Sequence, residues 1–177
     1  MIESLLGLAR THMNPRAETV RRTIEQAFDD FPYPGDAQLV SPGDDGGVDL
    51  REDLKGKHWK EIPRDILRYH HDDLPFLSNI GLRYYLPAYL LAALEDDWDF
   101  LHFVIFNLAP TLDMYGYESK QDYLRKRFSE FTPTQKLAIR EFMEFVRDEM
   151  SDRPMRSQIA SALEDYWGTV EPAPPSN

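Results

Sequence analysis

The side chains best suited to hold a metal ion are concentrated in one short run, His70-His71-Asp72-Asp73. On a helix, successive side chains point about 100° apart, so two adjacent histidines do not easily share one ion. His70 and Asp73, three residues apart, do face the same way. These two residues are the metal site that the sequence offers, and they support a metal-dependent enzyme as one hypothesis for the function.

This run supplies too few ligands on its own. A zinc or iron site takes three or four converging ligands, so the others would have to come from His58, His102 or an acidic segment elsewhere in the chain. The alternative interpretation is that the run ends a helix, where histidines interact favourably with the negative end of the helix dipole. We favour this second interpretation and expect no cofactor.

The acidic segment covers residues 29–53, which carry eight carboxylates and a single arginine, a balance of −7 within a net charge of −11 for the whole chain. Its candidate binding residues are Asp44, Asp45, Asp49, Glu52 and Asp53. Their spacing does not match an EF-hand calcium loop, in which acidic ligands alternate and a glutamate closes the loop. Serine, proline and glycine favour turns here, so we expect a long, solvated and partly mobile loop.

Other catalytic signatures do not occur in the sequence. There is no G-x-S-x-G nucleophile motif, no glycine-rich loop followed by the Lys-Ser/Thr pair that binds phosphate, and no cysteine for thiolate chemistry. We therefore expect a protein that is not an enzyme, and keep the His70 and Asp73 hypothesis as the alternative.

The net charge of −11 indicates which partners suit the protein. It repels nucleic-acid backbones and anionic membranes, whereas it attracts basic surfaces. The sequence thus predicts a basic protein partner, and neither nucleic acid nor a membrane. Residues 1–15 lack the basic start, long apolar centre and small-residue cleavage site of a signal peptide, which predicts a cytoplasmic location.

The sequence contains a nearly charge-free stretch, residues 74–94, which we interpret as the core around which the rest of the chain packs. Pro87 lies in the middle of this stretch. A proline inside a helix costs about 3 kcal/mol or more, whereas the first position of a helix accepts it. We therefore expect a helix from Pro87 to about Glu95, with Gly81 allowing a positive φ in the turn before it. One face of this helix should hold Ala88, Leu91, Ala92 and Glu95, with Leu91 buried.

An aromatic set in and after this stretch offers a third hypothesis, a small-molecule sensor. The set consists of Tyr84, Tyr85, Tyr89, Trp98 and Phe103. Such residues can line a ligand pocket, but aromatic side chains at helical spacing more often form the core. We favour the core interpretation.

The fold predicted from the whole chain is mainly α, a single-domain helical bundle of about five to seven helices with a long acidic loop, spanning residues 1–168 with a disordered tail at 169–177. Asn14-Pro15 and the capping box Thr132-Pro133-Thr134-Gln135 are the clearest helix starts. The segment 98–108 fits a helix or a buried strand, and we favour a helix. The other expected helices cover 15–28, the region after Pro63, 87–95, 121–128, 133–150 and 154–167.

The run GLRYYLPAYLLAAL at 81–94 resembles the central signature of an uncharacterised bacterial domain-of-unknown-function family. Trp59 in the sequence KHW, the tripeptide FLS at 76–78 and the helix start at Thr132 fit the same pattern, so the resemblance spans roughly residues 16–150. It implies a small, stand-alone bacterial protein, and it brings no catalytic residues with it.

The function favoured by the sequence is therefore a non-enzymatic domain that binds a basic protein through its acidic surface, as toxin-neutralising immunity proteins do. Size, acidity and the lack of a catalytic motif support this hypothesis. Electrostatic complementarity of this kind mainly speeds association.

Overall fold

Eight α-helices joined by short 3₁₀ turns build the part of the chain that the computed structural model describes, residues 14–43, 45–95, 98–110 and 119–171. No β-strand occurs within these residues. The mainly helical, single-domain fold predicted from the sequence is confirmed. The helices are α1 (Pro15–Phe28), α2 (Val48–Leu54), α3 (Arg64–Tyr69), α4 (Asn79–Ala93), α5 (Trp98–Leu108), α6 (Lys120–Arg127), α7 (Pro133–Phe145) and α8 (Arg153–Asp165).

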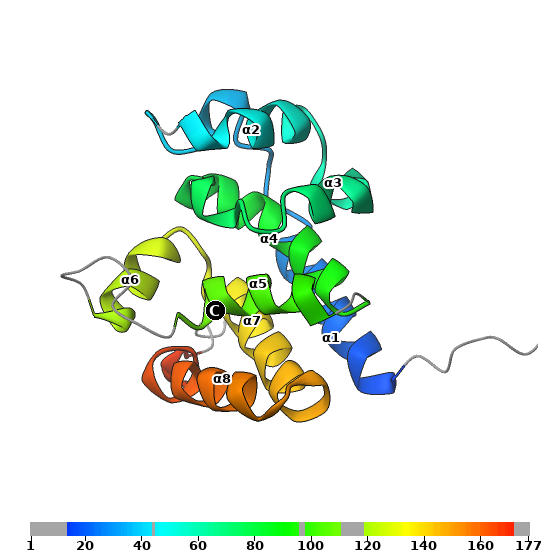
Figure 1. Ribbon diagram of the computed structural model, residues 1–177, viewed down its shortest axis with the longest axis vertical. Coiled ribbons are helices and arrows are strands. Elements are labelled where there is room, and N and C mark those ends of the chain that lie inside the picture. Colours follow the sequence, from blue (N-terminus) through cyan, green and yellow to red (C-terminus); the bar gives the residue numbers. More distant parts are fainter. Residues whose placement is uncertain (1–13, 44, 96–97, 111–118, 172–177) are drawn as a thin grey trace, which may run out of the picture.

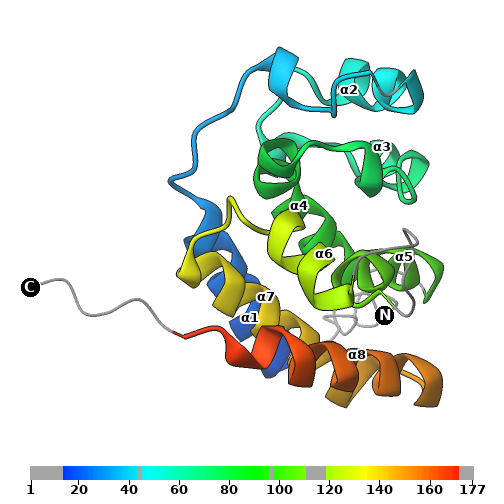
Figure 2. The ribbon, with the colours of Figure 1, turned by 90° about the vertical axis from the view of Figure 1, so that its left-hand side faces the viewer.

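Helix α4 runs through the middle of the molecule, and the other helices pack around it (Figure 1 and Figure 2). α1 lies along both α4 and α7, and α3 and α5 also contact α4. α2 lies at one end of the molecule and α8 at the opposite end, at the top and the bottom of both views. A site on α2 is therefore far from α8. None of the helices in the described ranges is long and apolar enough to cross a bilayer.

Helix α4 corrects the prediction for the central stretch. It begins at Asn79 and contains Pro87 in its interior, instead of beginning at the proline. Ser78 caps it, because its hydroxyl oxygen accepts a hydrogen bond from the backbone N–H of Gly81 at 2.9 Å. Proline removes one hydrogen bond from the preceding turn, but almost every side chain from Gly81 to Ala93 is buried. Burial on nearly all sides offsets that cost.

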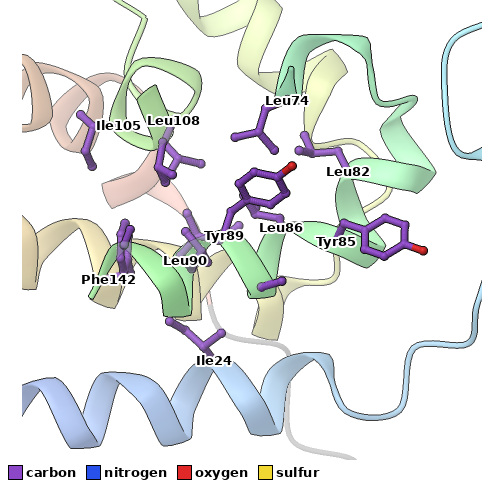
Figure 3. Close-up of a cluster of buried hydrophobic side chains, with 14 of the residues drawn as sticks. Ile24, Leu74, Leu82, Tyr85, Leu86, Tyr89, Leu90, Ile105, Leu108 and Phe142 are labelled. Atoms are coloured by element: carbon purple, nitrogen blue, oxygen red, sulfur yellow. The ribbon is translucent and has the colours of Figure 1, made fainter. Parts of the chain in front are cut away.

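The side chains of α4 form the centre of the hydrophobic core, as the sequence predicts. Figure 3 shows Leu90 pointing into the same cluster as Ile24 of α1 and Phe142 of α7. The tyrosines of the aromatic set are also part of this core, since Tyr84, Tyr85 and Tyr89 are all buried. They do not line an open pocket. The side chain of Trp98 lies outside the described residues.

The phenol groups of two core tyrosines bind backbone carbonyls. Tyr85 donates its hydroxyl hydrogen toward the carbonyl oxygens of Leu54 and Lys57, at 2.6 and 3.0 Å. Tyr89 donates to the carbonyl oxygen of His70 at 3.2 Å. Burial raises the pKa of both phenols well above the ordinary value of about 10. Both side chains therefore stay protonated in the folded protein at a pH where an unfolded chain ionises them.

This difference predicts how the protein responds to alkali. Because the folded state holds protons that the unfolded state has lost, these two phenols leave the stability unchanged below about pH 10 and lower it as the pH rises further. A titration that records tyrosinate absorbance and circular dichroism together should show the last tyrosinates forming only as helicity is lost. In denaturant, all nine tyrosines should ionise in one step. Complete ionisation of a chain that keeps its helicity would contradict the buried positions.

The local start signals are confirmed. Asn14 caps α1 with Pro15 in its first turn, and Thr132 and Gln135 form the capping box of α7. The segment 98–108 is a helix, α5, as favoured. The helix expected to reach residue 150 ends in a π-helical turn, Val146–Met150. A 3₁₀ turn, Trp167–Thr169, follows α8, so the predicted tail begins inside an ordered turn, and residues 172–177 lie outside the described part.

The acidic segment differs from the predicted long loop. It contains two 3₁₀ turns, Asp36–Gln38 and Asp45–Gly47, and the helix α2. Leu50 and Leu54, one turn apart on α2, are fully buried and anchor this helix to the core. Before α2, Val40 forms one isolated antiparallel bridge to Leu77. The carboxylates of α2 are therefore held in place by a packed helix.

Candidate functional site

His70 is the residue around which the predicted site residues gather. It follows α3 as its C-terminal capping residue, as the helix-end interpretation predicts, and its side chain is only 1% exposed. Its Nδ1 lies 2.7 Å from an oxygen of Asp73, and its Nε2 lies 2.9 Å from an oxygen of Asp53 on α2. The imidazole thus links α2 to the loop after α3.

This arrangement differs from a metal centre. Both ring nitrogens of His70 lie within hydrogen-bond distance of a carboxylate oxygen, so neither nitrogen is free to face an ion. Asp53 and Asp73 also lie at opposite edges of the ring, so they do not converge on one point.

The further ligands considered for the metal hypothesis have other roles or positions. Nδ1 of His58 accepts a hydrogen bond from the backbone N–H of Lys60, and His102 is exposed on α5. Within the described ranges, no three side chains of metal-binding type form a group that could hold an ion. His70 and Asp73 are therefore neighbours, as the sequence predicts, but as a hydrogen-bonded pair.

Tyr69 gives this part of the surface an exposed aromatic ring. Its side chain is 69% exposed, and its ring meets that of His70 edge to face, with the ring centroids 4.8 Å apart. The side chains of Asp53 and Asp73 are 42% and 25% exposed, so both carboxylates are partly accessible beside the buried imidazole. Asp49 lies one helical turn before Asp53 and is exposed. We call this set, Asp49, Asp53, Tyr69 and Asp73, the Tyr69 face.

The remaining predicted binding residues lie near this face or outside the described part. Asp44 is not among the described residues. Asp45 is exposed in the 3₁₀ turn before α2. Glu52 lies on α2 and pairs with Lys55 of the same helix and with Arg51. The structure therefore places four of the five predicted acidic residues on α2 or the turn that precedes it.

The sequence interpretation missed Tyr69, although its spacing carried a signal. Leu67 and His70 are buried, and Ile66 packs against the core. Tyr69 is about 200° around the helix from Leu67, so it must point away from the core. A large aromatic side chain on the solvent-exposed face of a short helix was the signal for this residue in the sequence.

Two acidic side chains of this region influence a buried phenol. The acidic groups Asp72 and Asp73 act on the buried phenol of Tyr89 and add to the effect of burial in raising its pKa. The Nδ1 of His71 lies 2.8 Å from the carbonyl oxygen of Arg68, and its ring packs against Phe103. The Tyr69 face therefore combines an exposed ring with several carboxylates.

Comparison with known proteins gives one match. A family model described as a family of unknown function (DUF6714) matches residues 16–171. No curated protein and no solved structure matches the chain. The match begins where the resemblance in the sequence begins and extends through α8, beyond the end expected near residue 150. Because the family model covers most of its length, the chain belongs to the DUF6714 family, a family of unknown function.

Proposed function

We propose that this protein is a non-enzymatic binding domain that holds a basic protein partner on its Tyr69 face, in the manner of an immunity protein. The observation that carries the proposal is the exposed ring of Tyr69, set against His70 with Asp53 and Asp73 at either edge of that imidazole. A bacterial source and a cytoplasmic location belong to the same proposal.

The chemistry of this face suits an arginine or lysine side chain. A guanidinium stacked on a tyrosine ring gains about 0.5–2 kcal/mol, and it can form charge-assisted hydrogen bonds with a carboxylate at the same time. Tyrosine is also among the residues that most often dominate binding energy in protein interfaces. An arginine-bearing loop or helix of the partner could therefore contact Tyr69 and Asp53 together.

The residues packed beneath the Tyr69 face lower the loss of conformational entropy on binding. His70 is buried and contacts Tyr69, Asp53 and Asp73, while Leu50 and Leu54 anchor α2. Groups already held in place lose little conformational freedom when a partner arrives. The net charge of −11 adds long-range attraction for a basic protein and should raise the association rate.

Capture from a lysate of the native host at low ionic strength tests this proposal. The wild-type chain, fixed to a support, should retain a basic protein that is released by added salt. Tyr69→Ala leaves the charge unchanged and should weaken binding of that protein by about thirtyfold, as expected for a dominant interface residue. For an immunity function, the wild type should suppress the activity of the purified partner and Tyr69→Ala should not do so at the same concentration.

A matched pair of charge variants controls for non-specific attraction. Asp49→Asn on α2 and Glu164→Gln on α8 each remove one negative charge from an exposed position, at opposite ends of the molecule. Only Asp49→Asn should slow association with the partner. Equal effects of the two variants, full binding by Tyr69→Ala, or no captured basic protein would each count against the Tyr69 face.

A further inference from the structure

His70 is a buried side chain that can gain or lose a proton, and the proposed binding function uses it only as a support. Among the described residues, three polar side chains are buried, Asn107, Gln135 and His70, and only the last of them changes charge with pH. Its ring nitrogens lie 2.7 Å from a carboxylate oxygen of Asp73 and 2.9 Å from one of Asp53. Asp53 belongs to α2, which lies beside α3 in both views (Figure 1 and Figure 2). A titratable group therefore joins two separate elements of the fold.

The number of hydrogens decides how many of these two contacts are hydrogen bonds. Two hydrogen bonds among one imidazole and two carboxylates need two hydrogens, one for each bond. A neutral imidazole carries one N–H and one lone pair, and ionised carboxylates carry no hydrogen. The neutral ring therefore bonds to one carboxylate and turns a lone pair toward the other. With one more proton in the cluster, both contacts become charge-assisted hydrogen bonds.

The contact with Asp53 is the one that we expect to break when the extra proton leaves. Asp73 is only three residues from His70, and its oxygen is the nearer of the two. The side chain of Asp53 is the more exposed one, so water can replace the ring as its donor. The backbone of His70 stays in place, because its carbonyl oxygen accepts hydrogen bonds from the phenol of Tyr89 and from the backbone N–H of Asp73. The movement is therefore confined to Asp53 and the end of α2.

The charged and titratable groups around this ring come from several segments. They are Asp53 of α2 and Lys57 after it, Tyr69 of α3, Tyr89 of α4, and His71, Asp72 and Asp73 in the turn after α3. The phenol of Tyr89, whose pKa is raised by burial, stays protonated throughout the range in which an imidazole titrates. His71 titrates in the same range as His70. A test must therefore follow the ring of His70 itself.

We propose that Asp53, His70 and Asp73 form a proton-dependent latch between α2 and the turn that follows α3. With two hydrogens in the cluster, the latch is closed and both carboxylates are held against the ring. As the pH rises through the range of imidazole titration, about pH 5 to 8, one proton leaves to solvent. The ring then keeps its bond to Asp73, and the side chain of Asp53 turns to water. The buried leucines of α2 keep the helix itself on the core. An effect of pH on partner binding would rest on the proposed function as well, so the latch is tested on the free chain.

Nuclear magnetic resonance of the full chain, titrated from about pH 5 to 8, tests the latch. The ¹⁵N signals assigned to the ring of His70 should show two N–H groups at the acidic end and one, at Nδ1, at the basic end. Over the same transition, the amides of residues 51–55 should lose protection against hydrogen exchange by about tenfold, after correction for the intrinsic effect of pH, because one charge-assisted hydrogen bond is lost. A ring of His70 that does not change over this range would overturn the proposal. So would a ring that changes while the amides of residues 51–55 keep their protection.

Two variants of α2 show whether Asp53 is the group that is released. An asparagine amide both donates and accepts hydrogen bonds, so Asp53→Asn should bond to the neutral ring and abolish the loss of protection at higher pH. Glu52→Gln also removes one negative charge from α2, but from a side chain that pairs with Arg51 and Lys55, and it should keep the wild-type response. An unchanged response in Asp53→Asn, or equal effects of the two variants, would overturn the latch. Circular dichroism checks that each variant is folded, and if Asp53→Asn is not, the wild-type titration alone decides.

Discussion

Leu90→Ala is expected to lower the free energy of unfolding by about 2–5 kcal/mol. Leu90 is fully buried in the cluster that α4 shares with α1 and α7 (Figure 3). Truncation removes buried apolar surface and leaves a cavity that a packed interior closes only in part. Chemical denaturation followed by circular dichroism measures the change, as a lower midpoint with the same slope.

Leu91→Ala is the matched control, with the same residue type in the same helix one position further on. The sequence analysis expected Leu91 to be buried, but the structure places it half-buried at the wall of an open pocket between α1, α3 and α4. Its truncation should cost about 1 kcal/mol or less. Equal losses at the two positions would contradict the orientation of α4 in the core.

Gly81→Ala is expected to destabilise the protein by about 3 kcal/mol, or to prevent folding. A Cβ atom at this position would lie 2.1 Å from the carbonyl oxygen of Leu39. That oxygen already accepts a hydrogen bond from the backbone N–H of Ser78 at 2.9 Å, and Leu39 itself is fully buried. Because the added Cβ is fixed to the helix backbone and would clash with a backbone oxygen, no side-chain rotation relieves the contact. Thermal unfolding of the variant measures the loss.

Gly56→Ala separates this clash from the ordinary strain of replacing a glycine. Gly56 has a φ of +69°, but a Cβ there would meet no other atom within 4 Å. Its replacement should cost about 1 kcal/mol, the usual penalty for a left-handed residue with a side chain. If Gly81→Ala were no more harmful than Gly56→Ala, the close approach of Leu39 to α4 would be wrong.

Helix starts were predictable from the sequence because their causes are local. The side chains of Asn14, and of Thr132 with Gln135, accept hydrogen bonds from backbone N–H groups within three residues of themselves, and both predicted helix starts are confirmed. The helix start predicted at Pro87 was wrong because the local effect of proline is outweighed by packing. The helix around it is buried against elements far away in the sequence, and no pattern within 74–94 contains that information.

The prediction of a long loop in the acidic segment was also wrong, but for a different reason. Its many charges, prolines and glycines indicated a loop, yet Leu50 and Leu54 repeat at helical spacing and both are fully buried. Two apolar residues one turn apart were the available signal for α2. The composition correctly indicated that the carboxylates of this segment are exposed. The burial of Leu50 and Leu54, however, determines that residues 48–54 form a helix.

Only the local contacts of the candidate site were predictable from the sequence. His70 and Asp73 are neighbours because they are three residues apart, which the sequence predicts. Asp53 reaches the other nitrogen of His70 from 17 residues upstream, and that contact depends on how α2 packs near α3. The open pocket beside Leu91 likewise arises from the arrangement of several elements. Such features follow from tertiary packing and not from any spacing in the sequence.

The most direct test of the Tyr69 face is hydrogen–deuterium exchange of the full chain, alone and with the captured basic partner. The account predicts slower exchange in residues 48–54 and 69–73 when the partner is bound, with α7 and α8 unchanged. Protection confined to α7 and α8, or to the pocket residues of α4, would contradict it.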